Sequence, residues 1–193
     1  MRHPRPLPVT AQGTSLVEVL VALLLLAVGL LGGSAMQLSS LRARHESALL
    51  STATQLAASM AERMRANPAQ MQALDADNPY LGLDYQAGPL EEAGGAPACL
   101  GDTGCSAAQL AQFDIAEWKQ QLRKDLPGAR LRICRDALAW DAAAQGLQWS
   151  CSGGSGAPFV IKLGWRGRQG RERVAQEAGA MPKIAMQLAA GAP

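Results

Sequence analysis

An uncharged stretch near the start of the chain constrains the fold more than any other feature. Residues Val19–Leu41 contain no Asp, Glu, Lys, Arg or His and consist mainly of Leu, Val, Ala and Gly. A helix rises about 1.5 Å per residue, so this stretch is long enough to cross a hydrocarbon layer about 30 Å thick. A helix in a soluble core rarely stays apolar on every side over such a length. The stretch is therefore predicted to span a membrane.

A short basic leader precedes this stretch and superficially resembles a secretory signal peptide. It carries Arg2, His3 and Arg5 but no acid. Two features argue against ordinary signal-peptide removal, because no clear small-residue cleavage site follows the apolar run and Glu18 stands at its front edge. A carboxylate inside a membrane is costly unless a cation pairs with it. Glu18 is therefore expected either to reach water at the interface or to pair with a cation of a neighbouring chain.

The residues around Glu18 resemble the type IV prepilin signature. The segment reads Gly13-Thr14-Ser15-Leu16-Val17-Glu18-Val19-Leu20-Val21-Ala22. The resemblance implies that a prepilin peptidase cleaves between Gly13 and Thr14 and methylates the new N-terminus at Thr14, although Phe or another large apolar residue is usual at that position. Glu18 would become the fifth residue of the mature chain. Its carboxylate would pair with the α-ammonium group of a docked subunit and fix the register of the growing filament.

Further segments resemble one branch of minor pilins, the PilV or type IV pilus modification family. They read Gly29-Leu30-Leu31-Gly32, Met36-Gln37-Leu38 and Glu62-Arg63-Met64-Arg65-Ala66-Asn67-Pro68, the last of which points to this branch. With the Cys-containing C-terminal half, the resemblance covers most of the chain. It implies an α+β, type IV pilin-like fold. In that fold a long N-terminal helix, transmembrane in its first half, packs on a small antiparallel sheet with an extra helix.

Periodicity divides the chain into four parts. We expect a leader at 1–13, a transmembrane and assembly half-helix at 14–41, an amphipathic half-helix at 42–67 and a head domain at 68–193. No Pro lies between Thr14 and Pro68, so one helix from Thr14 to about Asn67 is predicted. Its apolar stripe comprises Leu38, Leu41, His45, Leu49, Thr52 or Ala53, Leu56, Met60 and Met64. His45 on this stripe is interpreted as a structural histidine and not as a metal ligand.

The head is predicted to hold a second helix and a small sheet. Residues 69–105 are rich in Pro, Gly, Asn and Asp and are expected to form a loop. Ser106-Ala107-Ala108-Gln109 has the pattern of a capping box, followed by an apolar stripe of Ala111, Ile115, Trp118 and Leu122 and a stop at Pro127-Gly128. Short alternating or apolar runs predict strands at 129–134, 147–151, 159–165 and 184–188. Most of the few aromatic residues fall in this half and are expected in its core.

All four cysteines, Cys99, Cys105, Cys134 and Cys151, follow the apolar stretch. Their spacing differs from the closely spaced pairs of zinc sites, and an even number in an exported domain favours two disulfides. Three connectivities exist. We favour Cys99–Cys105, which would close a Gly-Asp-Thr-Gly turn, and Cys134–Cys151, which would join adjacent strands.

The sequence holds no recognisable catalytic constellation. It has two histidines and neither a Walker loop nor a Gly-x-Ser-x-Gly elbow. It therefore predicts no enzymatic activity, no cofactor and no metal site. Asp75, Asp77 and Asp84 form an acidic stretch without the EF-hand pattern, so a solvated loop is favoured over a Ca²⁺ site.

Charge is unevenly distributed along the chain, although the formal net charge is only +2 and argues against a strongly basic nucleic-acid-binding protein. Eight acids and no base lie between Arg65 and Lys119, whereas twelve bases and five acids lie from Lys119 onward. The densest basic cluster comprises Arg166, Arg168, Arg171 and Arg173, in a predicted hairpin turn. A solvated turn is the favoured interpretation, contact with an acidic surface of another subunit the second, and DNA binding the third.

Together these features favour a minor pilin that takes part in assembly or priming of type IV pili, and so in twitching motility and attachment. It would sit in the bacterial inner membrane with its head in the periplasm and then join the pilus. The expected partners are other minor and major pilins, the prepilin peptidase, the inner-membrane assembly platform and membrane lipid, with nucleic acid ranked last. A minor pseudopilin of type II secretion and a DNA-binding pilus component for DNA uptake are the alternatives.

Overall fold

The structure is a computed structural model that describes residue 13, residues 15–88, residue 99, residues 104–166 and residues 181–188. The chain divides into two units, Met1–Arg44 and His45–Pro193, and the first helix, α1 (Leu16–Arg65), contributes residues to both. We call the second of these the head unit. Its other elements are α2 (Pro68–Met71), a 3₁₀ turn (Asp75–Asp77), β1 (Leu83–Gln86), α3 (Ala107–Asp125), β2 (Arg130–Arg135), β3 (Trp140–Asp141), β4 (Gly146–Leu147), β5 (Phe159–Gly164) and β6 (Ile184–Gln187).

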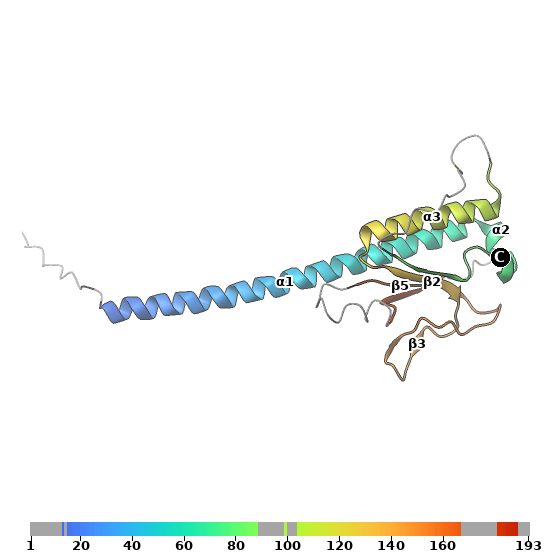
Figure 1. Cartoon of the computed structure of the whole chain (residues 1–193). Helices are drawn as coiled ribbons and strands as arrows, with labels where there is room; N and C mark the ends of the chain where they lie inside the picture. The colour runs from blue at the N-terminus through green and yellow to red at the C-terminus, as the bar shows by residue number, and fades with distance from the viewer. Residues whose placement is uncertain (1–12, 14, 89–98, 100–103, 167–180, 189–193) are drawn as a thin grey trace, which may run out of the picture. The chain divides into compact units, whose positions relative to one another are not determined.

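Four of these strands form one antiparallel sheet in the order β1-β2-β5-β6. The two central strands pair from Arg130 opposite Gly164 to Arg135 opposite Phe159. β3 and β4 form a separate two-stranded hairpin. In Figure 1, α3 runs beside the second half of α1 and the sheet lies against them. The α+β fold class is confirmed, with a long N-terminal apolar helix, a small antiparallel sheet and an extra helix.

One hydrophobic core joins the helices to the sheet of the head unit. The predicted stripe of α3 is buried in it, and the capping box at Ser106 forms as expected, with Gln109 N–H donating to Ser106 Oγ at 3.2 Å. On the sheet, Leu131 and Ile133 of β2 lie opposite Leu163 and Ile161 of β5, and all four are fully buried. The alternation in β2 therefore directs one face of the sheet to the core, as an antiparallel sheet on helices requires.

Three of the predicted strands correspond to β2, β5 and β6, whereas two other expectations are wrong. Residues 147–151 do not form one strand, because only Leu147 is in β4 and the chain then leaves the hairpin. The expected loop at 69–105 contains α2, the 3₁₀ turn and the edge strand β1. β1 has only four residues, Leu83-Asp84-Tyr85-Gln86, and its strand geometry comes from pairing with β2, which no local pattern announces.

The central strand β5 is buried on both faces, although its sequence alternates as if one face met water. All six of its residues are buried. The segment 136–152 covers the face away from the helices, and a Cβ on Gly164 would fall 3.0 Å from Trp149 Cζ2. Lys162, on the same face, is fully buried. The alternation therefore identified the strand correctly but not its covered outer face.

Lys162 is tolerated inside because three oxygen atoms surround its ammonium group. Its Nζ lies 2.5 Å from Asp136 Oδ2 and donates to the carbonyl oxygens of Gln148 at 2.7 Å and Ser150 at 2.6 Å. Burial of Asp136 acts to raise its pKa, but Lys162 and hydrogen bonds from Ser152 and Leu138 outweigh this effect and lower the pKa to about 2. The pair holds the covering segment onto β5.

The Asp136 carboxylate predicts a specific loss of stability in acid. Because its pKa is lower in the folded chain than the usual value of about 3.9, its stabilising contribution is complete above pH 4 and is lost as the pH falls through about 2. Unfolding of the full chain in detergent micelles, followed by Trp fluorescence, should show Asp136→Asn less stable than wild type at pH 7. The difference in unfolding free energy between wild type and Asp136→Asn should become smaller as the pH falls from 4 to 2. A difference that stays constant down to pH 2, as expected for the exposed control Asp125→Asn, would refute this assignment.

Candidate assembly site

The start of α1 contains the segment that resembles the prepilin signature. Gly13 and Ser15 are described, while Thr14 between them lies outside the described residues. The helix begins at Leu16, and Val19 N–H donates to Ser15 O at 3.2 Å. Glu18 lies in the first turn with its side chain exposed, where the positive end of the helix dipole favours an acid. Its carboxylate is therefore available to a cation from outside the chain.

The rest of this half of α1 offers apolar surface on every side. Residues 15–48 are all exposed in the isolated chain. By length and composition, α1 could cross a membrane. Gly29 and Gly33 lie one helical turn apart, and a Cβ on either would meet nothing within 4 Å. Such a surface needs lipid or other helices around it.

The second half of α1 changes from this all-round exposure to one buried stripe. Leu49, Ala53, Leu56, Met60 and Met64 are buried in the head unit as predicted, together with Ala57 and Ala61. The stripe starts later than expected, because Leu38, Leu41 and His45 are exposed. His45 is therefore not packed into the core, contrary to its interpretation as a structural histidine.

The segment Arg63-Met64-Arg65-Ala66-Asn67-Pro68 fastens α1 to α3. Arg63 Nη1 donates to Asp114 Oδ1 at 2.9 Å and to Glu117 Oε2 at 2.7 Å. Asn67 Nδ2 donates to the carbonyl oxygen of Ala107 at 2.8 Å, at the start of α3. Met64 fills the core and Pro68 begins α2, where a missing N–H costs nothing. We call the contacts of Arg63 and Asn67 with α3 the clasp.

Tyr80 completes the clasp from the segment that follows α2. It is fully buried, and its hydroxyl donates to Asp114 Oδ2 at 3.1 Å. Burial raises the pKa of Tyr80 and the Asp114 carboxylate adds to the rise, whereas Asn67 and Arg63 lower it. The net pKa is raised, so Tyr80 stays protonated and able to donate. The sequence predicted no role for Tyr80 or Asp114. The signal that could have identified Asp114 is its position as an acid beside Ala111 and Ile115 on the apolar stripe of α3.

The cysteines are joined as the sequence favours, Cys99 to Cys105 and Cys134 to Cys151. The first disulfide lies just before the capping box of α3. The second ties the end of β2 to the segment that covers β5, and not to an adjacent strand as expected, because residue 151 lies outside any strand. Such closures typically add about 2–4 kcal/mol each.

All three acids of the predicted solvated loop, Asp75, Asp77 and Asp84, are exposed, and two of them, Asp75 and Asp84, also form ion pairs with arginines of β2. Asp75 lies 2.8 Å from Arg135 Nε. Asp84 lies 3.3 Å from Arg130 Nη2 and 3.7 Å from Arg132 Nη1. No group of three or more His, Cys, Asp or Glu side chains suited to a metal ion occurs among the described residues.

The arginine cluster is described only in part. Arg166 is exposed at the end of β5, whereas Arg168, Arg171 and Arg173 lie outside the described residues. Its predicted hairpin turn therefore stays a prediction.

Removing the cation of the clasp should destabilise the head unit. Arg63→Met leaves Asp114, which is largely buried, without its charged partner, and a cost of about 1.5–3 kcal/mol is expected. Arg65→Met is the matched control, since Arg65 is exposed and pairs with Glu62 of the same helix, so a change below about 0.5 kcal/mol is expected. Urea unfolding of both variants in detergent micelles measures the difference. Equal unfolding free energies of Arg63→Met and Arg65→Met would show that the clasp does not stabilise the head unit.

Comparisons with known proteins connect this geometry to one family. Residues 35–116 match the family model Tt1218-like, described as type IV pilin Tt1218. The matched region runs from residue 35, within the uncharged stretch of α1, through the clasp into α3, and it covers less than half of the chain.

Neither the curated proteins nor the solved structures contain a significant match to this chain. The family match and the α+β fold with its exposed N-terminal apolar helix together support a type IV pilin subunit.

Proposed function

We propose that this chain is a minor pilin that takes part in the assembly or priming of type IV pili. The observation that carries the proposal is Glu18, an exposed acid in the first turn of a helix whose next six turns are apolar on every side. Among the described residues one helix is long and apolar enough to cross a membrane, and the head carries two disulfides, which supports a structural role. The segment that forms the clasp supports the PilV branch within the pilins.

Processing of the N-terminus is the first step of the proposed mechanism. A prepilin peptidase removes residues 1–13 by cleavage between Gly13 and Thr14 and methylates Thr14. The apolar part of the helix, residues 14–41, then anchors the subunit in the inner membrane. Residues 42–67 and the head domain at 68–193 lie in the periplasm, which the two disulfides support, because disulfides persist in oxidising compartments.

Pairing of Glu18 is the second step. As a subunit leaves the bilayer and enters a bundle of apolar helices, its Glu18 carboxylate would be buried without water. An uncompensated charge in such surroundings is expensive, whereas a paired one is tolerated. The α-ammonium group of a neighbouring pilin supplies the cation, so only one axial register satisfies both charges. Motility and attachment then depend on this chain indirectly, through the filament.

The partners follow from these steps. They are other minor and major pilins, the prepilin peptidase, the inner-membrane assembly platform and the surrounding lipid. A minor pseudopilin of type II secretion would use the same N-terminal design, and a DNA-binding pilus component remains the third interpretation.

Replacement of Glu18 by Ala tests the assembly role. The variant should reach the membrane with an intact head but enter sheared pili at least about tenfold less, because the lost ion pair is worth several kcal/mol and about 1.4 kcal/mol already changes an equilibrium tenfold. Glu62→Ala is the matched control, an exposed acid further along α1. Immunoblots of sheared pili and of membranes quantify both variants.

Incorporation of Glu18→Ala at the wild-type level would rule out this role for the glutamate. Secreted proteins should be scored in the same strains and in a strain lacking the gene. Loss of exoproteins with normal surface pili would instead identify a pseudopilin.

A further inference from the structure

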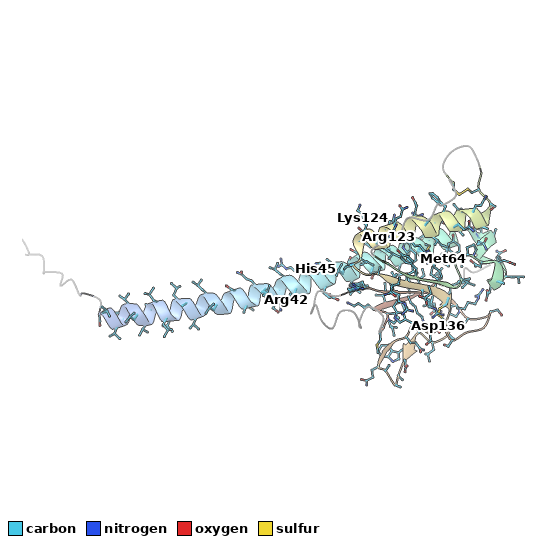
Figure 2. All side chains as sticks on the ribbon, in the orientation of Figure 1. Arg42, His45, Met64, Arg123, Lys124 and Asp136 are labelled. Atoms are coloured by element: carbon cyan, nitrogen blue, oxygen red, sulfur yellow. A yellow bond between two sulfur atoms is a disulfide. The ribbon has the colours of Figure 1, made fainter. Side chains whose placement is uncertain are left out.

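The direction of α3 places its C-terminal end near the start of the head unit. Trp118 Nε1 donates to the carbonyl oxygen of Leu56 at 2.9 Å, and Asp114 pairs with Arg63, so α3 runs antiparallel to α1. Arg123 and Lys124 occupy the last turn of α3. Figure 2 shows both at the end of α3 nearest His45, the first residue of the head unit.

Two further basic side chains lie at this end. Arg166 packs against the turn after α3: its backbone N–H donates to Pro127 O at 2.8 Å, and a Cβ on Gly128 would fall 2.6 Å from Arg166 Nε. Lys183 forms an ion pair of 2.9 Å with Glu46 on α1. We call the four residues Arg123, Lys124, Arg166 and Lys183 the basic collar.

The fold explains only part of this charge. Basic residues in the last turn of α3 complement the helix dipole. Among the described residues, the acids at this end include Glu46, which pairs with Lys183, and the exposed Asp125. Lys124 and Arg166 are exposed to solvent, so both present their positive charge at the surface.

The collar lies within a short length of chain from the proposed membrane boundary. Leu41 ends the uncharged run and precedes Glu46 by five positions, with Arg42 and Arg44 between them. Even a fully extended chain of this length spans at most about 18 Å, and a helix only about 7.5 Å. Glu46 therefore stays within about 18 Å of Leu41 in any conformation, so the chain itself tethers this end of the head unit close to a membrane whose boundary lies at Leu41.

Exposed apolar side chains accompany the collar. Met181, two residues before Lys183, is 43% exposed, and a Cβ on Gly146 of β4 would fall 2.6 Å from its Sδ. In the same hairpin Trp140 is 51% exposed. Basic residues combined with exposed Trp and other apolar side chains are typical of surfaces that lie at a membrane interface.

We propose that the basic collar binds anionic phospholipid headgroups and holds the head unit against the membrane before the subunit is extracted. The proposal rests on the membrane anchor of the proposed function. A nucleic acid or an acidic protein would also attract these charges, but the lipid surface is the partner to which the chain itself tethers them. Basic residues near a bilayer are attracted by anionic lipid, and salt weakens that attraction.

Amide hydrogen exchange of the full chain in nanodiscs tests the collar. Nanodiscs of phosphatidylcholine alone are compared with nanodiscs containing one part in three phosphatidylglycerol. Amides of residues 122–130 should exchange at least about threefold more slowly with the anionic lipid, and 0.5 M salt should remove the difference. The double variant Lys124→Gln, Arg166→Gln should lose the protection. Arg65→Gln, a substitution at an exposed arginine at the other end of the head unit, should retain it.

The outcomes separate this inference from the proposed function. Equal exchange in the two lipids, in a chain that inserts, would overturn the collar and leave the anchor intact. Protection by double-stranded DNA added to phosphatidylcholine nanodiscs, without protection by phosphatidylglycerol, would overturn the lipid assignment. A chain that does not insert into nanodiscs would overturn the anchor and the collar together.

Discussion

A helix that is apolar on every side cannot be stable in water, and this constraint organises the whole chain. Over residues 19–41 α1 has no polar face to turn to solvent, so it requires lipid or other helices. From Leu49 onward the same helix has one buried stripe, which forms part of the core of the head unit. The two halves of α1 are therefore suited to two different environments. The family match and the fold together support a pilin subunit.

Acids and bases that lie in different parts of the sequence form ion pairs with one another in the folded chain. Acids between residues 75 and 117 meet bases on β2 and at the end of α1: Asp75 with Arg135, Asp84 with two β2 arginines, and Asp114 with Arg63. These contacts tie a segment without regular periodicity to the helices and the sheet. Because most of them are partly exposed, their value lies more in fixing that arrangement than in stability.

The sequence predicted the parts of the fold that carry their own pattern. The helical stripe and the capping box identified α1 and α3, and alternation identified β2 and β5. β1 and the β3–β4 hairpin were not predicted. Their strands have only two to four residues and contain Asp, Gln or Gly, so their strand geometry depends on pairing with a neighbouring strand. Lys162 could not be placed inside from its sequence, since its compensation comes from Asp136 and from carbonyl oxygens 12 and 14 residues away. The role of Glu18 rests on resemblance and on its exposure at the helix start.

The mature N-terminus tests the central claim most directly, because it reports both the processing and the fate of the apolar helix. The intact mass of the protein, purified from membranes and from sheared pili of the bacterium that makes it, identifies the first residue. We predict a chain that begins at Thr14, with Glu18 as its fifth residue and the whole apolar stretch retained. A chain that keeps residues 1–13, or one cut after Leu41 and released in soluble form, would contradict the account.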